Sequence, residues 1–338
     1  MPQPRFTRRD FIHLALVATG SLLAGCRPGK EPNPTSTQPI STQATEIPAS
    51  PTTPPESTAA LASKVMVLAT GLDFPEGPAF DPQGNLWCVE LNGGNLVSWS
   101  EGEVKRYPTG GRPNGMAFDH KGRAWVCDSG QNKIRRYDPA NNKWETLVEK
   151  IDGQPLQSPN DLSFDAQGNL LFTCPNFADN NPTGYVGCLT PTGKLTKIIE
   201  GIYRPNGLDI VDGGKALVVA DTWQKILLKG GWEAASCTWQ DPQPWAKVGG
   251  SEGPDGMIPG ADGLLYVAIY GDGVIKVVNE AGKIEQVYKI PGSNPTNLAV
   301  DPAGKLGLVV TETEKGQLLS LPEVQPGVAI FDGGDFWP

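Results

Sequence analysis

The chain repeats one pattern, seen first in the segment Pro75-Glu76-Gly77-Pro78-Ala79-Phe80-Asp81-Pro82-Gln83-Gly84. A proline is followed by a polar residue, a small or polar residue, an apolar run and, nine positions after the proline, a glycine. The six prolines that begin this pattern are Pro75, Pro113, Pro159, Pro205, Pro254 and Pro295. Successive prolines are 38, 46, 46, 49 and 41 residues apart. A period of about 40 to 50 residues with several short β runs is typical of a β-propeller.

Each period has room for four strands. In the first, an inner strand at 77–80 precedes a turn at 81–84, a hairpin formed by 85–90 and 95–100, and an outer strand at 103–107. The glycine that ends each pattern follows a turn, where hairpins often require a positive φ. We therefore predict an all-β fold, a six-bladed β-propeller over residues 63–338 that is closed by N- and C-terminal strands.

The last repeat has no outer strand of its own. Residues 298–300, 305–310 and 317–321 supply three strands. Residues 64–68 could supply the fourth and close the ring, or residues 327–338 could take that place. Closure would remove the exposed sheet edges of an open array.

The N-terminal region contains two targeting patterns in sequence. Thr7-Arg8-Arg9-Asp10-Phe11-Ile12 resembles a twin-arginine export motif, and Leu23-Ala24-Gly25-Cys26 resembles a bacterial lipobox. The apolar stretch between them is too short for a permanent membrane span. We interpret residues 1–26 as a lipoprotein signal peptide and 27–62 as a disordered Pro/Thr/Ser-rich linker. The protein is then expected to be exported and anchored outside a bacterial cell membrane through lipidated Cys26.

Composition excludes several classes of function. The net charge of −9 and the absence of a Lys/Arg cluster argue against a nucleic-acid partner. Beyond the signal, the sequence holds one histidine, His120, in the turn at 119–122, which leaves little for a catalytic triad. We expect an exposed turn residue there. The five cysteines after Cys26 form no CxxC pair, which argues against zinc. Cys174 and Cys188 could face each other across a hairpin.

The residue after each proline is polar in all six repeats. If the repeats align as a propeller, these residues form a ring at the axis: Glu76, Asn114, Asn160, Asn206, Asp255 and Thr296. All carry oxygen, and two are acids that would neutralise a divalent ion. Ca²⁺ prefers six to eight oxygen ligands. The other interpretation is structural, because Asn-Gly is a common turn pair. The set favours a divalent metal, with Ca²⁺ ahead of Zn²⁺, Mn²⁺ or Mg²⁺.

Three of these segments resemble motifs of the regucalcin/gluconolactonase family of six-bladed propellers. They are Phe74-Pro75-Glu76-Gly77-Pro78, Arg204-Pro205-Asn206-Gly207-Leu208-Asp209 and Gly253-Pro254-Asp255-Gly256-Met257, and the resemblance extends over about residues 64–321. It implies that Glu76, Asn206 and Asp255 bind the metal, and that Asn160 lies beside metal and substrate. It also implies that Asp255 is catalytic, as ligand and as base or nucleophile.

The resemblance implies a small lactone or ester as substrate, hydrolysed with help from the metal. Two departures weaken the case for a sugar lactone. Ser158 stands where sugar-lactone members carry arginine, and the segment Thr173-Cys174-Pro175-Asn176 lacks an acid expected to contact substrate. We assign substrate binding to Asn160, Asn114 and Asp221.

Some residues near the second strands keep two interpretations. Glu90, Asp128, Asp221 and Glu312 could line the channel mouth or simply end strands. Trp87, Trp125, Trp223 and Trp245 are expected to pack blades, although Trp223, which closely follows Asp221, is kept open as a substrate contact.

Other classes of function compete with a hydrolase. One is a surface-tethered, non-catalytic binding module of the NHL-repeat kind, which the linker and Ser158 favour. Another is a propeller like strictosidine synthase, whose characteristic residues are not apparent. The two ring acids favour the hydrolase. We expect a monomer with a small-molecule partner.

Overall fold

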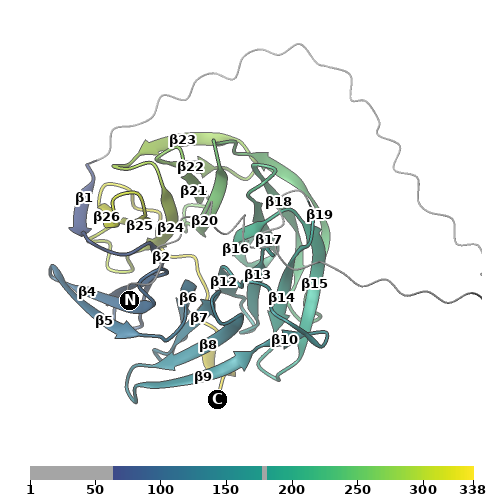
Figure 1. The fold of residues 1–338 in the computed structure, drawn as a ribbon. Coiled ribbons are helices and arrows are strands. Elements are labelled where there is room, and N and C mark those ends of the chain that lie inside the picture. The colour runs from purple at the N-terminus through teal and green to yellow at the C-terminus, as the bar shows by residue number, and fades with distance from the viewer. Residues whose placement is uncertain (1–63, 177–180) are drawn as a thin grey trace, which may run out of the picture.

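The computed structural model describes residues 64–176 and 181–338. These residues form six four-stranded antiparallel sheets set around one axis (Figure 1). The predicted all-β, six-bladed propeller is therefore confirmed. The predicted signal peptide, its Cys26 and the linker at 27–62 lie outside the described residues. Within the described residues, no helix is long and apolar enough to cross a membrane.

Each blade runs from an inner strand at the axis to an outer strand at the rim. Five blades use consecutive strands. The first three are β2 (Pro75–Phe80), β3 (Leu86–Glu90), β4 (Asn95–Ser100) and β5 (Glu103–Pro108); β6 (Pro113–Phe118), β7 (Ala124–Asp128), β8 (Lys133–Asp138) and β9 (Lys143–Val148); and β12 (Leu162–Phe164), β13 (Leu170–Cys174), β14 (Gly184–Leu189) and β15 (Leu195–Ile202).

The remaining blades repeat this order. They are β16 (Pro205–Val211), β17 (Ala216–Asp221), β18 (Ile226–Glu233) and β19 (Thr238–Lys247); β20 (Gly253–Pro259), β21 (Leu265–Tyr270), β22 (Val274–Val278) and β23 (Ile284–Lys289); and β24 (Pro295–Val300), β25 (Leu308–Glu312) and β26 (Gln317–Leu321) with β1 (Met66–Ala69). A hairpin of β10 (Lys150–Ile151) and β11 (Gln154–Pro155) precedes the third blade, and two short 3-10 turns cover Asp212–Gly214 and Gly334–Phe336.

Strand β1 closes the ring. It pairs antiparallel with β26, with Met66 opposite Ser320, and becomes the outer strand of the sixth blade. Trp99 of the first blade donates its indole N–H to the Leu68 carbonyl at 2.9 Å, which ties the closing strand to its neighbour. The segment 64–68 therefore contributes the fourth strand, and the alternative placement of 327–338 there was wrong.

Residues 327–338, the C-terminal strap, instead cross the ring at the end where the inner strands finish, which we call the lower end (Figure 1). Single bridges join Val328 to Gly260 and Phe331 to Phe164. His120 lies in the predicted turn and is partly exposed, with its Nε2 2.6 Å from Asp335 Oδ1 in the strap.

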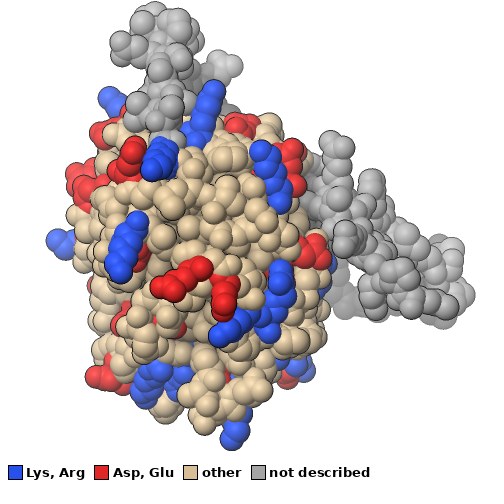
Figure 2. Space-filling view, turned by 90° about the vertical axis from the view of Figure 1, so that its left-hand side faces the viewer, with Lys and Arg blue, Asp and Glu red and all other residues tan. Residues whose placement is uncertain are grey.

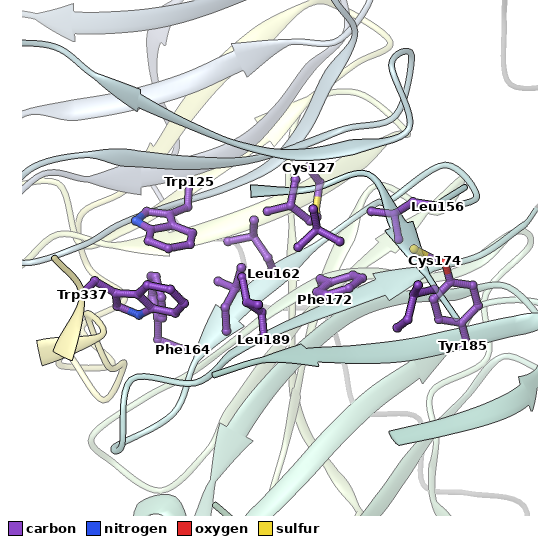
Figure 3. Packing of buried hydrophobic residues seen from close by; sticks show 14 residues of the cluster. Trp125, Cys127, Leu156, Leu162, Phe164, Phe172, Cys174, Tyr185, Leu189 and Trp337 are labelled. Atoms are coloured by element: carbon purple, nitrogen blue, oxygen red, sulfur yellow. The ribbon is translucent and has the colours of Figure 1, made fainter. Parts of the chain in front are cut away.

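Between adjacent blades, apolar side chains pack in separate clusters. In one of them Trp125 meets Phe164 and Trp337 edge-on, with ring centroids 5.3 and 4.6 Å apart (Figure 3). The indole N–H groups of Trp87 and Trp125 bond to Asp81 and Asp119 in the inner-strand turns. The prediction that these two tryptophans pack blades is confirmed.

All five cysteines in the described residues are free and buried. In the β13–β14 register, Cys174 lies opposite Tyr185 while Cys188 lies opposite Leu171. The two thiols belong to different hydrophobic clusters, so the suggested pairing across the hairpin was wrong.

On the face seen in Figure 2, acidic and basic side chains are interspersed.

Candidate metal and active site

The inner strands begin irregularly, at the end of the ring that we call the upper end. In five blades the pairing with the second strand shifts register just after the proline, for example between Glu76 and Ala79 and between Pro254 and Met257. Such bulges release a residue from the regular ladder and re-aim side chains, and they often occur beside active sites. The residues thus released include the predicted ring.

The residues just before three of the prolines add strain at the upper end. Phe74, Ser158 and Arg204 have φ values of 62°, 52° and 64°, and Gly253 in the fifth blade has 121°. A left-handed conformation is costly for a residue with a side chain, and such strain concentrates at functional sites. Because the same position is strained in several blades, the upper end is the end at which a functional site is expected.

Backbone contacts bring the starts of the inner strands together. A Cβ on Gly77 would lie 2.5 Å from the Asn114 carbonyl oxygen, and one on Gly207 would lie 2.5 Å from that of Asp255. The Gly115 N–H donates to the Asn160 carbonyl at 2.6 Å. Only glycine permits these approaches between neighbouring blades.

Threonine hydroxyls make the corresponding contacts at other junctions between blades. Thr173 donates to the Asn206 carbonyl at 2.8 Å, Thr222 to that of Pro254 at 2.7 Å, and Thr296 to that of Pro75 at 2.9 Å. These contacts span five of the six junctions, and at the sixth a Cβ on Gly256 would lie 2.2 Å from Asn297 Cγ, so the starts of all six inner strands are in close contact around the axis. All six ring residues are buried, which fits one polar ring at the axis.

The donor set of the ring fits a hard cation. Glu76 and Asp255 are only 3% and 1% exposed, and the other positions supply amide or hydroxyl oxygen. Within 64–176 and 181–338, no three His, Cys, Asp or Glu side chains group as a metal cluster. A bound metal would therefore need the amide oxygens of Asn114, Asn160 and Asn206 beside the two acids. Carboxylates and amides suit Ca²⁺ or Mg²⁺ better than Zn²⁺.

A second polar layer lies directly below the ring. The residue after each ring position is glycine in four blades, but it is Asp161 in the third and Asn297 in the sixth. The Asn297 amide donates to Asp161 Oδ2 at 3.1 Å, between opposite blades. We call this contact the neck. Burial, with a smaller contribution from the charge of Asp255, raises the pKa of Asp161 to about 7.

Sequence reasoning missed this neck, although comparing the repeats position by position would have shown that two of the six copies replace the glycine with a hydrogen-bonding side chain.

The acids at the ends of the second strands hold loops in place. Glu90 accepts bonds from Arg106 and Asn95, and Asp128 pairs with Arg135 at 2.8 Å. Burial opposes ionisation of Glu90, but the bonds from Arg106 and Asn95 prevail and lower its pKa. Glu312 accepts backbone N–H groups of the sixth blade. These contacts support the strand-ending interpretation.

Asp221 has the same kind of environment. Its Oδ1 accepts the Gln224 backbone N–H at 3.0 Å, and its Oδ2 accepts the Gln224 side-chain amide at 2.7 Å. The carboxylate is thereby held in its own loop, and substrate binding by Asp221 stays a prediction.

The rim above the ring contains an aromatic side chain and a cation. Trp223 is exposed, and the guanidinium of Arg204 lies 5.4 Å from its ring centroid. The Ser158 N–H donates to Asn132 Oδ1 at 2.8 Å. The expectation that Trp223 packs a blade was wrong, because its side chain is exposed, and a contact with substrate stays a prediction. Sequence reasoning did not single out Arg204, which reaches this rim through the strained turn before Pro205.

Residues 74–314 match the family described as the SMP-30/Gluconolactonase/LRE-like region. The chain belongs to this family. The resemblance inferred from the ring motifs is therefore confirmed. Among curated relatives, a gluconolactonase of Zymomonas mobilis is 28% identical over 48% of this chain and 52% of its own length. The lactonase drp35 of Staphylococcus aureus is 31% identical over 61% of this chain and 67% of its own length. The match thus spans about half of the gluconolactonase.

Solved structures show the same fold. A gluconolactonase from Xanthomonas campestris superposes with a TM-score of 0.69 at 26% identity, covering 77% of this chain and 89% of that one. A regucalcin from Agrobacterium tumefaciens, described as a calcium-binding protein, has a TM-score of 0.69 at 20% identity and covers 78% and 94%.

Proposed function

We propose that the protein hydrolyses a small lactone or ester at the polar ring, with a divalent metal, Ca²⁺ by preference, bound there. The observation that carries this proposal is the closed ring of buried oxygen donors, with Glu76 and Asp255 as its two acids, in a member of a family that includes lactonases. The calcium-binding description of the regucalcin neighbour supports the choice of ion.

A divalent metal in the ring would polarise the carbonyl oxygen of the substrate and orient water. Glu76 and Asp255 would balance its charge, and Asn114, Asn160 and Asn206 would direct amide oxygens or N–H groups toward the metal or substrate. In this mechanism Asp255 accepts a proton from the attacking water as its oxygen bonds to the carbonyl carbon. When the ester C–O bond breaks, that proton passes to the departing oxygen, and a hydroxy acid is formed from a lactone.

The rim favours a substrate less polar than an aldonolactone. Ser158 has a short, uncharged side chain, and its backbone N–H is already bonded to Asn132. The exposed indole of Trp223, with Arg204 beside it, offers an aromatic surface along the same rim. We therefore infer a lactone or ester with few hydroxyl groups.

The decisive test is metal-dependent turnover by the purified protein after chelation, with Ca²⁺, Mg²⁺, Mn²⁺ or Zn²⁺ added back. We expect activity on a lactone panel to return with Ca²⁺ and kcat/KM to fall at least 100-fold in Asp255→Asn, because general-base catalysis typically contributes 10²–10⁴-fold. Asp241→Asn, an exposed acid on the outer strand β19, is the matched control. Tight metal binding without turnover of any lactone or ester would instead favour the non-catalytic binding module.

We further propose that the protein is exported and anchored to the outside of a bacterial membrane by lipidated Cys26, on the strength of the two N-terminal patterns. Cys26→Ser is expected to abolish labelling by a fatty-acid probe and to move the protein from the membrane to the soluble fraction. Replacement of Arg8 and Arg9 by lysine should retain it in the cytoplasm. Unchanged membrane association of Cys26→Ser would contradict lipid anchoring.

A further inference from the structure

Below the neck, the channel widens into a cavity of about 420 Å³. The inner strands of all six blades line it, and the strap residues Val328, Ile330, Phe331 and Asp332 form its outer wall. None of the six ring residues lines it, and the Asp161–Asn297 contact lies between the two levels. Its volume falls within the range of small-molecule pockets, about 300–1,000 Å³. The cavity is therefore distinct from the polar ring.

The cavity exists because the fifth residue of the repeat is small in most blades. These residues are Ala79, Ala117, Ser163, Asp209, Ile258 and Ala299, and all six line the space. The blades of a propeller surround a central channel, and its width at each level depends on the side chains that line it. At this level four of the six side chains are small, and one, Asp209, is an acid.

Asp209 is that acid, and it is only 5% exposed. Its Oδ1 accepts bonds from the Ser163 hydroxyl and the Ile210 N–H, both at 2.8 Å. Its Oδ2 receives no hydrogen bond from the residues that the structure describes. A buried carboxylate is costly unless it is paired. Burial raises the pKa of Asp209 to about 7, so the carboxyl is ionised in mildly basic solution and would be stabilised there by a cationic donor.

The remaining lining indicates the chemistry of a ligand. Five aspartates line the cavity, namely Asp81, Asp119, Asp161, Asp209 and Asp332, and its described lining includes no Lys, Arg or His. Asp119 is already paired with Arg123. Most of the other lining side chains are apolar, among them Met116, Leu208, Met257 and Phe331. An apolar body with one positive charge matches this environment.

We propose that the lower cavity is a second small-molecule site that binds an apolar primary amine, with its ammonium group at Asp209 Oδ2. The alkyl chain lies among the methionine, leucine and phenylalanine side chains toward the strap. The strap lies between the cavity and solvent, since Val328 and Ile330 line the cavity and are 44% and 48% exposed. Bridges to Gly260 and Phe164 hold the strap in place, so that a ligand enters this side only when the strap moves.

Calorimetric titration with n-hexylamine, 1-hexanol and hexanoate at pH 8 tests this site, since the three probes share a chain and differ in the head group. We expect hexylamine to bind at least tenfold more tightly than hexanol, and hexanoate not to bind. Asp209→Asn should weaken hexylamine binding at least tenfold, and Ala117→Leu should abolish it by filling the cavity. Thermal unfolding without ligand checks that each variant is folded.

Two controls locate the amine. Asp241→Asn should leave binding unchanged, and so should Glu76→Gln, which removes a charge from the ring but not from the cavity. Loss of binding in Glu76→Gln would place the amine at the ring and overturn the proposal. Equal affinities for amine and alcohol, no binding of hexylamine, or undiminished binding in either Asp209→Asn or Ala117→Leu would overturn it as well.

Discussion

Asp161 and Asp209 are acids of the same channel, each buried and each hydrogen-bonded on Oδ1 by the N–H of the next residue. Asp161 also accepts a bond from Asn297 through Oδ2, whereas the second partner of Asp209, Ser163, uses Oδ1 again. Asp161 therefore uses both oxygens within the protein and holds the neck together, whereas Asp209 Oδ2 is left to bind a ligand in the cavity. Asp161 is the third residue of its repeat and Asp209 the fifth of the next, so acids at different levels of one channel perform different tasks.

The raised pKa of Asp209 makes a prediction about stability. The folded state holds a proton that the unfolded state releases between about pH 3.8 and pH 7, so folding stability from this group falls as pH rises through that window. Asp209→Asn removes the effect. We expect the free energy of unfolding of the variant, relative to the wild type, to rise by about 2–4 kcal/mol from pH 4 to pH 8. Urea denaturation with chelator measures it, and a pH-independent difference would contradict it.

At this scale the sequence predicted the ring well and the cavity not at all. Glu76 and Asp255 could be found because a fixed distance from a proline places them on one level. Asp209 sits in the same motif, but an aspartate near the end of a strand usually belongs to a turn. Only the packing of Ser163 from another blade shows that it is buried.

Among the elements, each inner strand depends on its neighbour for its position. The Thr222 hydroxyl, just after β17, bonds to the Pro254 carbonyl beside Asp255 in β20. A side chain of one blade thereby fixes the backbone that presents Asp255 of the next. This explains how loosely paired, bulged strand starts are held in one place.

Thr222→Val tests this coupling. The substitution keeps the shape but leaves the Pro254 carbonyl without this donor, so we expect a loss of about 1–3 kcal/mol in the free energy of unfolding. Turnover should fall as well, because Asp255 is next in the chain. Thr146→Val, on the exposed face of β9, should change stability by less than about 0.5 kcal/mol. Equal effects of the two substitutions in denaturant titrations would contradict the coupling.

The strands of the first blade were predicted almost residue for residue, and β4 begins and ends where expected, at Asn95 and Ser100. The turn glycines Gly84, Gly122 and Gly168 have φ values of 81°, 78° and 75°, as the pattern required. The closing strand was left undecided because 64–68 and 327–338 lie outside the six patterns. Which of them pairs with β26 depends on contacts that no local period encodes.

For the whole molecule, the strap covers the lower end of the ring and forms one wall of the cavity (Figure 1). Trp337 packs on Trp125 and donates its indole N–H to the Gly168 carbonyl at 2.7 Å (Figure 3). Lys121 and His120 reach the strap from the second blade. These partners are about 170 to 220 residues apart in the chain, and sequence patterns do not reveal contacts of that range.

Trp337→Ala should loosen the attachment of the strap to the blades. Deleting a buried tryptophan typically costs about 3–5 kcal/mol, here with the indole hydrogen bond lost in addition. We expect a lower melting temperature and stronger binding of a fluorescent apolar dye as the lower cavity opens. Phe336→Ala is the control, since Phe336 is 54% exposed and Trp337 only 6%. A dye response no greater for Trp337→Ala than for the control would show that the strap does not seal the cavity.

The pairing of β1 with β26 also means that the ring can close only late in synthesis of the chain. Met66 meets Ser320, so the first strand waits while about 250 further residues are made. At roughly 5–20 residues per second, that delay is on the order of 10–50 s. During this time β1 and the growing chain have unpaired edges that could join other chains. The closed ring is therefore a product of the finished polypeptide, and nascent chains halted before residue 317 should recruit chaperones that the complete protein no longer needs.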